Sequence, residues 1–216
     1  MEILYSDDRV VVCVKPAGVL STDEPGGMPE RLRLALGDGV VKSVHRLDRA
    51  VGGVMVYART KRAASDLGRQ MDVGAFSKEY RAVVHGVPAE ESGVMRDFLL
   101  RDTGRRMTYI VPEGMSGAQE ALLDYRVLGM AEGMSLLAIR LHTGRTHQIR
   151  CQLAGRGLPI VGDRKYGAND GAENIALWSR GVGFSHPRTG EELFFTREPP
   201  DAYPWDRFIP ADNKTT

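Results

Sequence analysis

One carboxylate stands alone in a strongly basic part of this chain. Between Lys42 and Arg62 the sequence contains six lysines or arginines and a single acid, Asp48. Surrounding cations keep such a carboxylate ionised, and an ionised aspartate can act as a nucleophile near neutral pH without an activating base. Asp48 closes the tetrapeptide His45-Arg46-Leu47-Asp48, which lies just before Gly52 and therefore on a loop that enters a strand. Loops on a rigid scaffold are where catalytic groups concentrate.

A second polar segment runs from Leu141 to Arg150. An apolar stretch ends before Gly144, and Thr146 is placed to cap a helix that continues through Leu153. The first turn of a helix and nearby arginine side chains together favour the binding of an anion. The alternative is an ordinary capped helix whose arginines lie at the protein surface.

Both segments belong to basic stretches, although the net charge of the chain is only +1. The second stretch, from Arg140 to Lys165, contains six lysines or arginines and one acid, Asp163. Two basic stretches with one carboxylate each predict a positive face that attracts phosphates. The alternative is that these charges are simply solvated.

The elements that must position these residues are mainly strands. Strands are expected where β-branched residues cluster or where apolar and polar residues alternate: Arg9–Lys15, Gly52–Ala58, Glu79–His85, Arg106–Val111, Ala121–Leu128, Ser135–Leu141, Ile175–Trp178 and Glu192–Thr196. Helices are expected at Pro29–Leu36, after Thr60 and after Thr146. Many strands with few helices predict an α+β fold with a mixed, mostly antiparallel β-sheet and flanking helices.

Composition sets the remaining limits. We expect one domain over residues 1–216, with a polar C-terminal tail from about Asp201. No apolar run approaches the roughly 20 residues that span a bilayer, and the first residues do not resemble a signal peptide, so a cytoplasmic location is expected. Cys13 and Cys151 have no metal-ligand spacing and are expected to be reduced, buried thiols.

Six motifs in order give the chain a resemblance to the RluA-type family of RNA pseudouridine synthases over nearly its whole length. They are Asp8–Gly18, His45–Arg49, Lys78–Gly86, Thr143–Arg150, Leu158–Gly167 and Ser185–Gly190. The resemblance implies an isomerase that acts on uridines in ribosomal or transfer RNA. It also implies a pseudouridine synthase fold and neither a metal nor an organic cofactor. A monomer is expected.

The same resemblance assigns roles to individual residues. Asp48 corresponds to the nucleophile, Arg150 to the arginine that pairs with it, and Tyr80 to the aromatic residue that stacks on the target base. Arg46 corresponds to the residue that enters the gap left by a flipped nucleotide. Further contacts with RNA are expected from Arg49 and Arg145. His45 and His147 are expected either to contact RNA or to be hydrogen-bonded residues of the scaffold.

Two departures from the family pattern stand out. The family usually has a threonine or serine pair after the Asp-Arg pair, whereas this chain has Ala50-Val51-Gly52-Gly53. Leu177-Trp178-Ser179 replaces the usual Leu-His-Ala. The stretch Gly86–Asp102 and the loop Ser21–Pro29 are the expected specificity elements, by their position alone.

Two rival functions could use the same residues. A metal-dependent hydrolase would use His45, Asp48, His142 and His147, but His142 and His147 are five residues apart, which does not suit a helical zinc pair. A non-catalytic RNA-binding module would keep the fold without the chemistry, and the presence of Asp48 with its expected partners argues against it.

Overall fold

The computed structural model describes residues 1–37 and 39–208. Contacts along the chain divide it into two compact units. Unit 1 comprises Met1–Glu79 and Trp178–Glu198, and unit 2 comprises Tyr80–Leu177 with the segment that begins at Pro199. Each unit is described by itself below.

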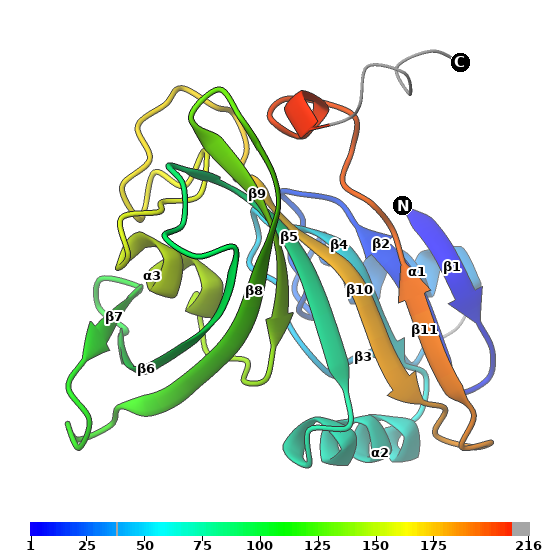
Figure 1. The fold of residues 1–216 in the computed structure, drawn as a ribbon. Helices are drawn as coiled ribbons and strands as arrows, with labels where there is room; N and C mark the ends of the chain where they lie inside the picture. Colours follow the sequence, from blue (N-terminus) through cyan, green and yellow to red (C-terminus); the bar gives the residue numbers. More distant parts are fainter. Residues whose placement is uncertain (38, 209–216) are drawn as a thin grey trace. The chain divides into compact units, whose positions relative to one another are not determined.

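Unit 1 is built on a mixed sheet (Figure 1). Its strands run in the order β1-β2-β4-β10, with β3 beside β4 and β11 beside β10. Only the pairing of β4 with β10 is parallel among these; the others are antiparallel. The strands are β1 (Glu2–Ser6), β2 (Val10–Lys15), β3 (Lys42–Ser43), β4 (Gly52–Ala58), β10 (Leu177–Ser185) and β11 (Glu192–Thr196).

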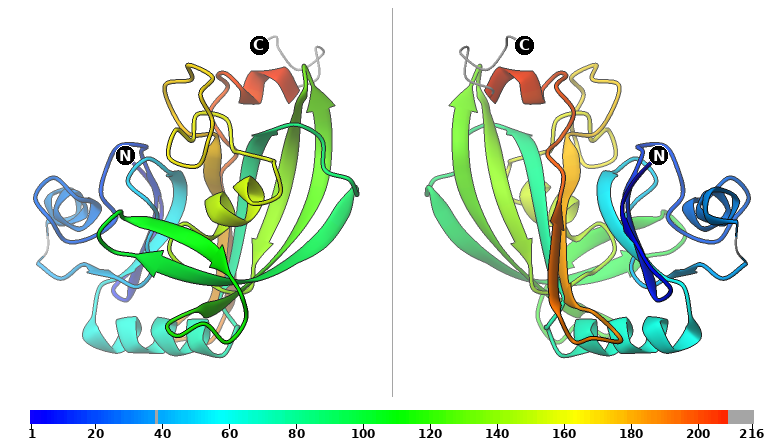
Figure 2. Two further views of the ribbon diagram at one scale, coloured as in Figure 1. Left: turned by 90° about the vertical axis from the view of Figure 1, so that its left-hand side faces the viewer. Right: turned by 90° about the vertical axis from the view of Figure 1, so that its right-hand side faces the viewer.

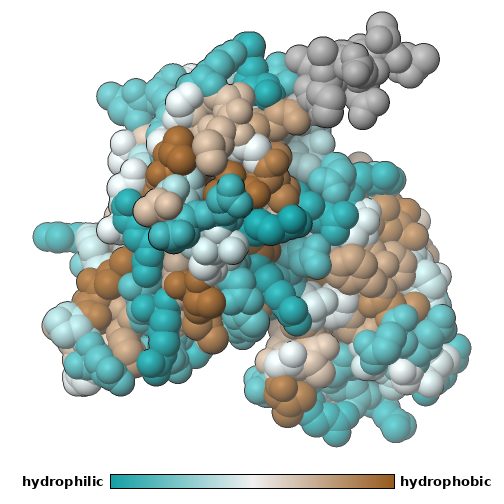
Figure 3. Space-filling view, in the orientation of Figure 1, coloured by the Kyte–Doolittle hydropathy of each residue, from teal (hydrophilic) through white to brown (hydrophobic). Residues whose placement is uncertain are grey.

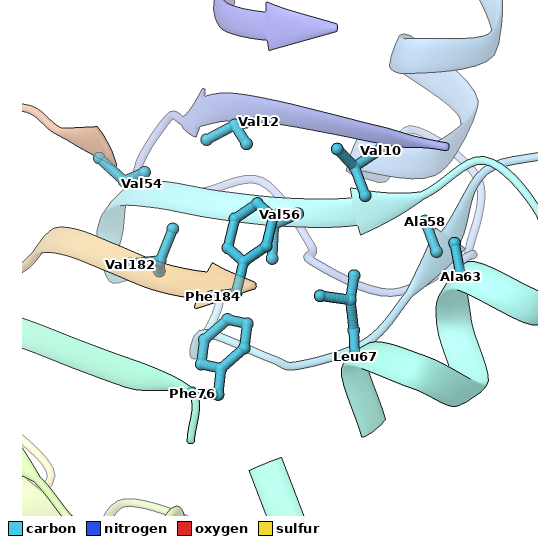
Figure 4. Packing of buried hydrophobic residues seen from close by; sticks show 10 residues of the cluster. All are labelled: Val10, Val12, Val54, Val56, Ala58, Ala63, Leu67, Phe76, Val182 and Phe184. Atoms are coloured by element: carbon cyan, nitrogen blue, oxygen red, sulfur yellow. The ribbon is translucent and has the colours of Figure 1, made fainter. Parts of the chain in front are cut away.

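Every residue of β4 is buried, because both faces of this strand are covered. On one face, alternate residues of β2 and β4 pack against helix α2 (Lys61–Asp72), which contributes Ala63 and Leu67 (Figure 4). Phe76 and Phe184 extend the same cluster, with their ring centroids 6.0 Å apart. This core holds β4 in place and with it the loop that precedes β4.

The two helices of unit 1 begin where local signals indicate. The Oγ1 atom of Thr60 accepts a hydrogen bond from the backbone N–H of Ala63 at 3.0 Å, so Thr60 caps α2 as expected. Helix α1 spans Met28–Leu36, one residue longer than predicted, and its first turn contains Pro29.

Unit 2 contains strands in the order β5-β9-β8-β6-β7 (Figure 2). The neighbouring pairs β9–β8, β8–β6 and β6–β7 are antiparallel. The elements are β5 (Ser77–His85), β6 (Ser92–Asp102), β7 (Met107–Val111), β8 (Gln119–Ala131), β9 (Met134–Leu141) and helix α3 (Gln148–Ala154). The mixed, mostly antiparallel sheet and the three α-helices of the described residues confirm the predicted α+β class.

Three local predictions were wrong. Ser92–Asp102, which was absent from the predicted strands, forms β6. The strand expected at Ile175–Trp178 begins at Leu177 and continues to Ser185. Thr146 does not cap α3: the N-cap is His147, in the left-handed conformation with φ 53°, and the turn before it is closed by the side chain of Gln148 instead.

The described part of the C-terminal tail contains one turn of 3-10 helix, Trp205–Phe208, and residues 209–216 lie outside the described part. On the face drawn in Figure 3, hydrophobic residues lie in groups separated by hydrophilic ones. Among the described residues, no helix combines the length and the apolar character that crossing a bilayer requires.

Candidate active site

Asp48 lies in unit 1, on the loop between β3 and β4, as expected. Leu47 is buried and anchors this loop, whereas Arg46 and Arg49 are exposed and Asp48 is half-buried. The backbone N–H of Val51 donates to the carbonyl oxygen of Asp48 at 3.0 Å, which turns the chain into β4. The loop therefore offers one carboxylate between two solvated guanidinium groups.

A buried lysine, Lys15, holds the backbone of this loop by hydrogen bonds. Lys15, at the end of β2, has no exposed surface, and its Nζ atom donates to the carbonyl oxygens of Pro16 at 2.9 Å, Val19 at 2.7 Å and Arg49 at 3.1 Å. Burial lowers the pKa of Lys15 to about 8, and the negative charge of Asp48 opposes that shift. Lys15 was not among the predicted site residues, although a lysine in a run of valines was a visible signal.

The loop is tied down a second time by Ser21. The hydroxyl of Ser21 donates to the carbonyl oxygen of Leu47 at 2.9 Å and accepts from the backbone N–H of Leu47 at 3.2 Å. The carbonyl oxygen of Ser21 accepts from the hydroxyls of Ser43 at 2.9 Å and Tyr57 at 3.1 Å. The segment before Asp48 is thus fixed residue by residue against the start of the Ser21–Pro29 loop.

His45 is also held inside unit 1. Its Nε2 atom accepts from the backbone N–H of Val56 at 3.2 Å, and its ring lies 5.5 Å from that of Phe76. Burial, with a smaller effect of Lys78, lowers the pKa of His45 to about 3. These contacts give His45 a role in positioning the loop; its expected contact with RNA stays a prediction.

The two departures from the family pattern meet in unit 1. Trp178 pairs with Gly52 where β10 runs beside β4. A Cβ atom on Gly52 would come within 2.5 Å of the Trp178 ring, and one on Gly53 would come within 2.2 Å of the backbone oxygen of Ser179. The tryptophan therefore excludes a side chain at position 52, directly after the turn that runs from Asp48 to Val51.

In unit 2, Arg150 forms a buried two-pronged ion pair with Asp163. Its Nε and NH2 atoms each lie 2.7 Å from one oxygen of that carboxylate. The guanidinium carbon also lies 5.1 Å from the centre of the Tyr166 ring. Two sequence motifs, Thr143–Arg150 and Leu158–Gly167, are joined by these contacts. Asp163 and Tyr166 were not predicted as site residues, and a lone acid in the second basic stretch was the available signal.

The residues of the turn before α3 are connected by a network of hydrogen bonds. The Oε1 atom of Gln148 accepts from the Thr143 hydroxyl at 2.7 Å and from the backbone N–H of Arg145 at 3.0 Å. The Nε atom of Arg145 donates to the carbonyl oxygen of Glu120 at 2.9 Å, and Nδ1 of His147 lies 2.9 Å from the hydroxyl oxygen of Tyr166. Arg145 and His147 are thereby oriented; the structure does not test their predicted contact with RNA.

Tyr80, in β5, is buried, with 6% of its surface exposed. Asp48 belongs to unit 1, and Tyr80 and Arg150 belong to unit 2. The expected pairing of Asp48 with Arg150 therefore stays a prediction.

The histidines of the metal-hydrolase rival have other partners. Nε2 of His142 lies 2.7 Å from an Asp124 oxygen, and His147 contacts Tyr166 as described. Within the described ranges, no three His, Cys, Asp or Glu side chains are grouped as a metal site would require.

Comparison with known proteins identifies the class. The model of the RNA pseudouridylate synthase family matches residues 9–155, so this chain belongs to that family, whose members are isomerases. A solved structure described as human RNA Pseudouridylate Synthase Domain Containing 1 has the same fold, with a TM-score of 0.79 and 24% identity over 93% of this chain and 84% of that one.

The curated relatives confirm the RluA-type branch. The chain is 33% identical to the dual-specificity RNA pseudouridine synthase RluA of Escherichia coli, over 89% of this chain and 90% of that protein. It is 30% identical to the ribosomal large subunit pseudouridine synthase D of Zymomonas mobilis, over 93% of this chain and 69% of that protein. An uncharacterized RNA pseudouridine synthase of Aquifex aeolicus is 33% identical, over 94% of this chain and 71% of its own length.

Proposed function

We propose that this chain converts uridine to pseudouridine in ribosomal or transfer RNA, with Asp48 as the nucleophile. The observation that carries the proposal is the Asp48 loop: a half-buried carboxylate flanked by exposed Arg46 and Arg49 and anchored from below by Lys15 and Ser21. Membership of the family supports the reaction. The relatives described above, a dual-specificity RNA pseudouridine synthase and a pseudouridine synthase of the large ribosomal subunit, support an RNA substrate.

The reaction is an isomerisation, so its atoms balance without a co-reactant. A carboxylate oxygen of Asp48 attacks ribose C1′ or uracil C6, and the N1–C1′ bond breaks. The uracil turns over, C5 bonds to C1′, and the bond between the Asp48 oxygen and C1′ or C6 breaks, which restores the free carboxylate. The proton lost from C5 is balanced by a proton gained at N1. The target must leave the base stack, because its faces are otherwise shielded. Arg46, exposed on the same loop, is proposed to fill the vacated position.

Tyr80 and Arg150 are proposed to complete the site. Tyr80 would stack on the target uracil, and Arg150 would pair with Asp48 and fix the direction of its carboxylate. The Asp163 carboxylate and the Tyr166 ring restrict the guanidinium of Arg150 to one orientation. A planar group that is held in place loses less freedom when it binds another carboxylate.

The decisive test is Asp48→Asn, which keeps the shape of the side chain and removes its charge. Pseudouridine formation on RNA from cells that lack the enzyme should fall by at least ~10⁴-fold, because a nucleophile is lost, while folding and RNA binding persist. Asp72→Asn, which removes an exposed acid at the end of α2, is the matched control and should keep full activity. Undiminished activity of the Asp48 variant would sink the proposal.

Two further outcomes address the rivals. Wild-type protein that binds RNA but forms no pseudouridine on any tested RNA would favour the non-catalytic module. Turnover that EDTA abolishes would favour a metal-dependent enzyme. We also propose a monomer in the cytoplasm, which light scattering and cell fractionation test directly.

A further inference from the structure

The first basic stretch is divided between the two ends of β4. Arg46 and Arg49 flank Asp48 before the strand, whereas Arg59 and Lys61 follow it. Lys42 belongs with the second group, because β3 pairs antiparallel with β4 and places Lys42 opposite Ala58. A seven-residue strand is about 20 Å long. Four of the six cations that seemed to surround Asp48 in the sequence, Arg62 included, are therefore at the other end of the strand.

These distal cations line a groove in unit 1 with a volume of about 780 Å³. Its walls come from the residues after Ser21, from α1, from the segment that forms β3, and from the first turn of α2. The groove is lined by Thr22, Asp23, Arg33, Gly39, Val40, Val41, Lys42, Ser43, Arg59, Thr60, Lys61 and Ala64. We call it the β3–α2 groove.

The charge of the β3–α2 groove is positive. Four of its lining residues are basic, and its acid, Asp23, forms an ion pair with Arg33 at 2.6 Å. Lys42 and Lys61 are exposed, and within residues 1–37 and 39–208 neither has an ion-pair partner. The positive end of the α2 dipole adds to this charge. Asp23 lies in the field of Lys42 as well as of Arg33, but four basic side chains against one acid leave the groove with an excess of positive charge, which favours an anionic ligand with more than one charge.

The groove is connected to the catalytic loop by a short, fixed path. Ser43 lines the groove and Asp48 follows five residues later, so their Cα atoms are at most about 18 Å apart. Ser21 bonds to Ser43 and to Leu47, and the next residue, Thr22, lines the groove. A ligand bound in the groove is therefore held at a set distance from Asp48, a distance that several nucleotides can span.

We propose that the β3–α2 groove binds the phosphodiester backbone of the substrate RNA at nucleotides that flank the target uridine. This inference rests on the proposed function, because it takes RNA to be the ligand of Asp48. Lysines bind phosphates as point charges without reading bases. The groove would accordingly set affinity and the register of the RNA, and it would select substrates long enough to reach it.

The test variant replaces Lys42 and Lys61 together by alanine. The control replaces Arg31 and Arg69 by alanine, which removes the same charge from α1 and α2 at exposed positions outside the groove. RNA affinity is measured in the inactive Asp48→Asn background at several salt concentrations. Turnover is measured in the active enzyme with a long RNA and with a minimal stem-loop that presents the same uridine.

The groove variant should raise KM for the long RNA by roughly 10-fold and leave kcat unchanged. The slope of log K against log salt should fall in magnitude by roughly 1.5, since each lost phosphate contact removes about 0.7 to 0.9. The minimal stem-loop should be processed equally by both enzymes, and Lys42→Arg with Lys61→Arg should restore the long RNA. An affinity and slope equal to those of the control would overturn the proposal.

The failure of this inference is distinguishable from failure of the proposed function. Affinity and salt slope are read without turnover, so they report on the groove even if no isomerisation is found. Conversely, a fully active groove variant with normal affinity would leave the role of Asp48 untouched.

Discussion

Lys15 occupies a position where its neighbours along β2 are Val12, Cys13 and Val14, and where a charge costs solvation free energy. Three carbonyl oxygens offset that cost, and one of them belongs to Arg49, the residue after the proposed nucleophile. Lys15 touches neither substrate nor reacting atoms in this account. It is a positioning residue that fixes the backbone next to Asp48.

Replacing Lys15 by methionine should separate its contribution to stability from its contribution to catalysis. The variant keeps most of the length of the side chain but leaves the carbonyl oxygens of Pro16 and Val19 without a donor, while that of Arg49 keeps the backbone N–H of Gly18. This loss should lower the free energy of unfolding by roughly 2–4 kcal/mol. Because the Asp48 loop loosens, kcat should fall by ~10-fold or more while KM for RNA changes little. Denaturant unfolding measures the free energy of unfolding, and steady-state kinetics measure kcat and KM. A loss of stability with unchanged kcat would reduce Lys15 to a structural role.

At the scale of elements, the contact between β4 and β10 explains the unusual residues beside Asp48. Gly52 has no positive φ, so its backbone accepts any residue, and the obstacle to a side chain is the ring of Trp178. Gly53 differs, because its φ is 122° and a Cβ atom would meet backbone rather than side chain. Glycine is needed at position 52 because of the side chain at position 178. At position 53 it is needed because of the backbone conformation and the neighbouring backbone.

A double-mutant cycle tests this distinction. Gly52→Ser alone should destabilise the protein by about 1–3 kcal/mol through overpacking, and Trp178→His in the same chain should recover most of that loss. Gly53→Ser, the matched control, should be destabilising whether or not Trp178 is changed. Thermal or urea unfolding of the five variants gives the coupling free energies. Additive effects of Gly52→Ser and Trp178→His would contradict the contact.

At the scale of the whole molecule, two groups link stability to acid pH. His45 is neutral in the folded protein because burial lowers its pKa to about 3, so the unfolded chain binds a proton first as the pH falls below 6.5. Burial works against ionisation of Asp170, but hydrogen bonds from His85 and from the backbone N–H groups of Gly162 and Ala172 lower its pKa to about 2. Both effects remove stability as the medium becomes more acidic.

The two contributions should appear in different pH windows. Between pH 6.5 and 5, wild-type protein should lose about 2 kcal/mol through His45 alone, and His45→Gln should flatten this part of the curve. Below pH 4, Asp170→Asn should flatten the remaining decline, because the carboxylate that must be protonated is gone. Free energies of unfolding from urea titrations at pH 7, 5 and 3.5 provide the measurement. If the free energy of unfolding of the His45 variant fell as steeply between pH 6.5 and 5 as that of the wild type, His45 would not be the group responsible.

Local signals in the sequence predicted much of the fold. Thr60 caps α2, the apolar run at Arg9–Lys15 contains β2, and Glu192–Thr196 matches β11 because capping and alternation act over a few residues. Strand β6 was missed because its buried residues, Met95 and Leu99, are four apart and show no alternation. Only its pairing with β8 and β7 makes that stretch a strand.

The sequence by itself determined the class of enzyme and predicts Asp48 as its nucleophile, since six motifs in order can be recognised without knowing how the chain folds. The tertiary structure decided which residues support that aspartate: Lys15 lies 33 positions before it in the chain and Trp178 lies 130 positions after it. It also decided that Arg150 forms an ion pair with Asp163, and that Lys42 and Lys61 line the same groove at the far end of β4. Sheet register sets these contacts, and register depends on pairings between distant segments.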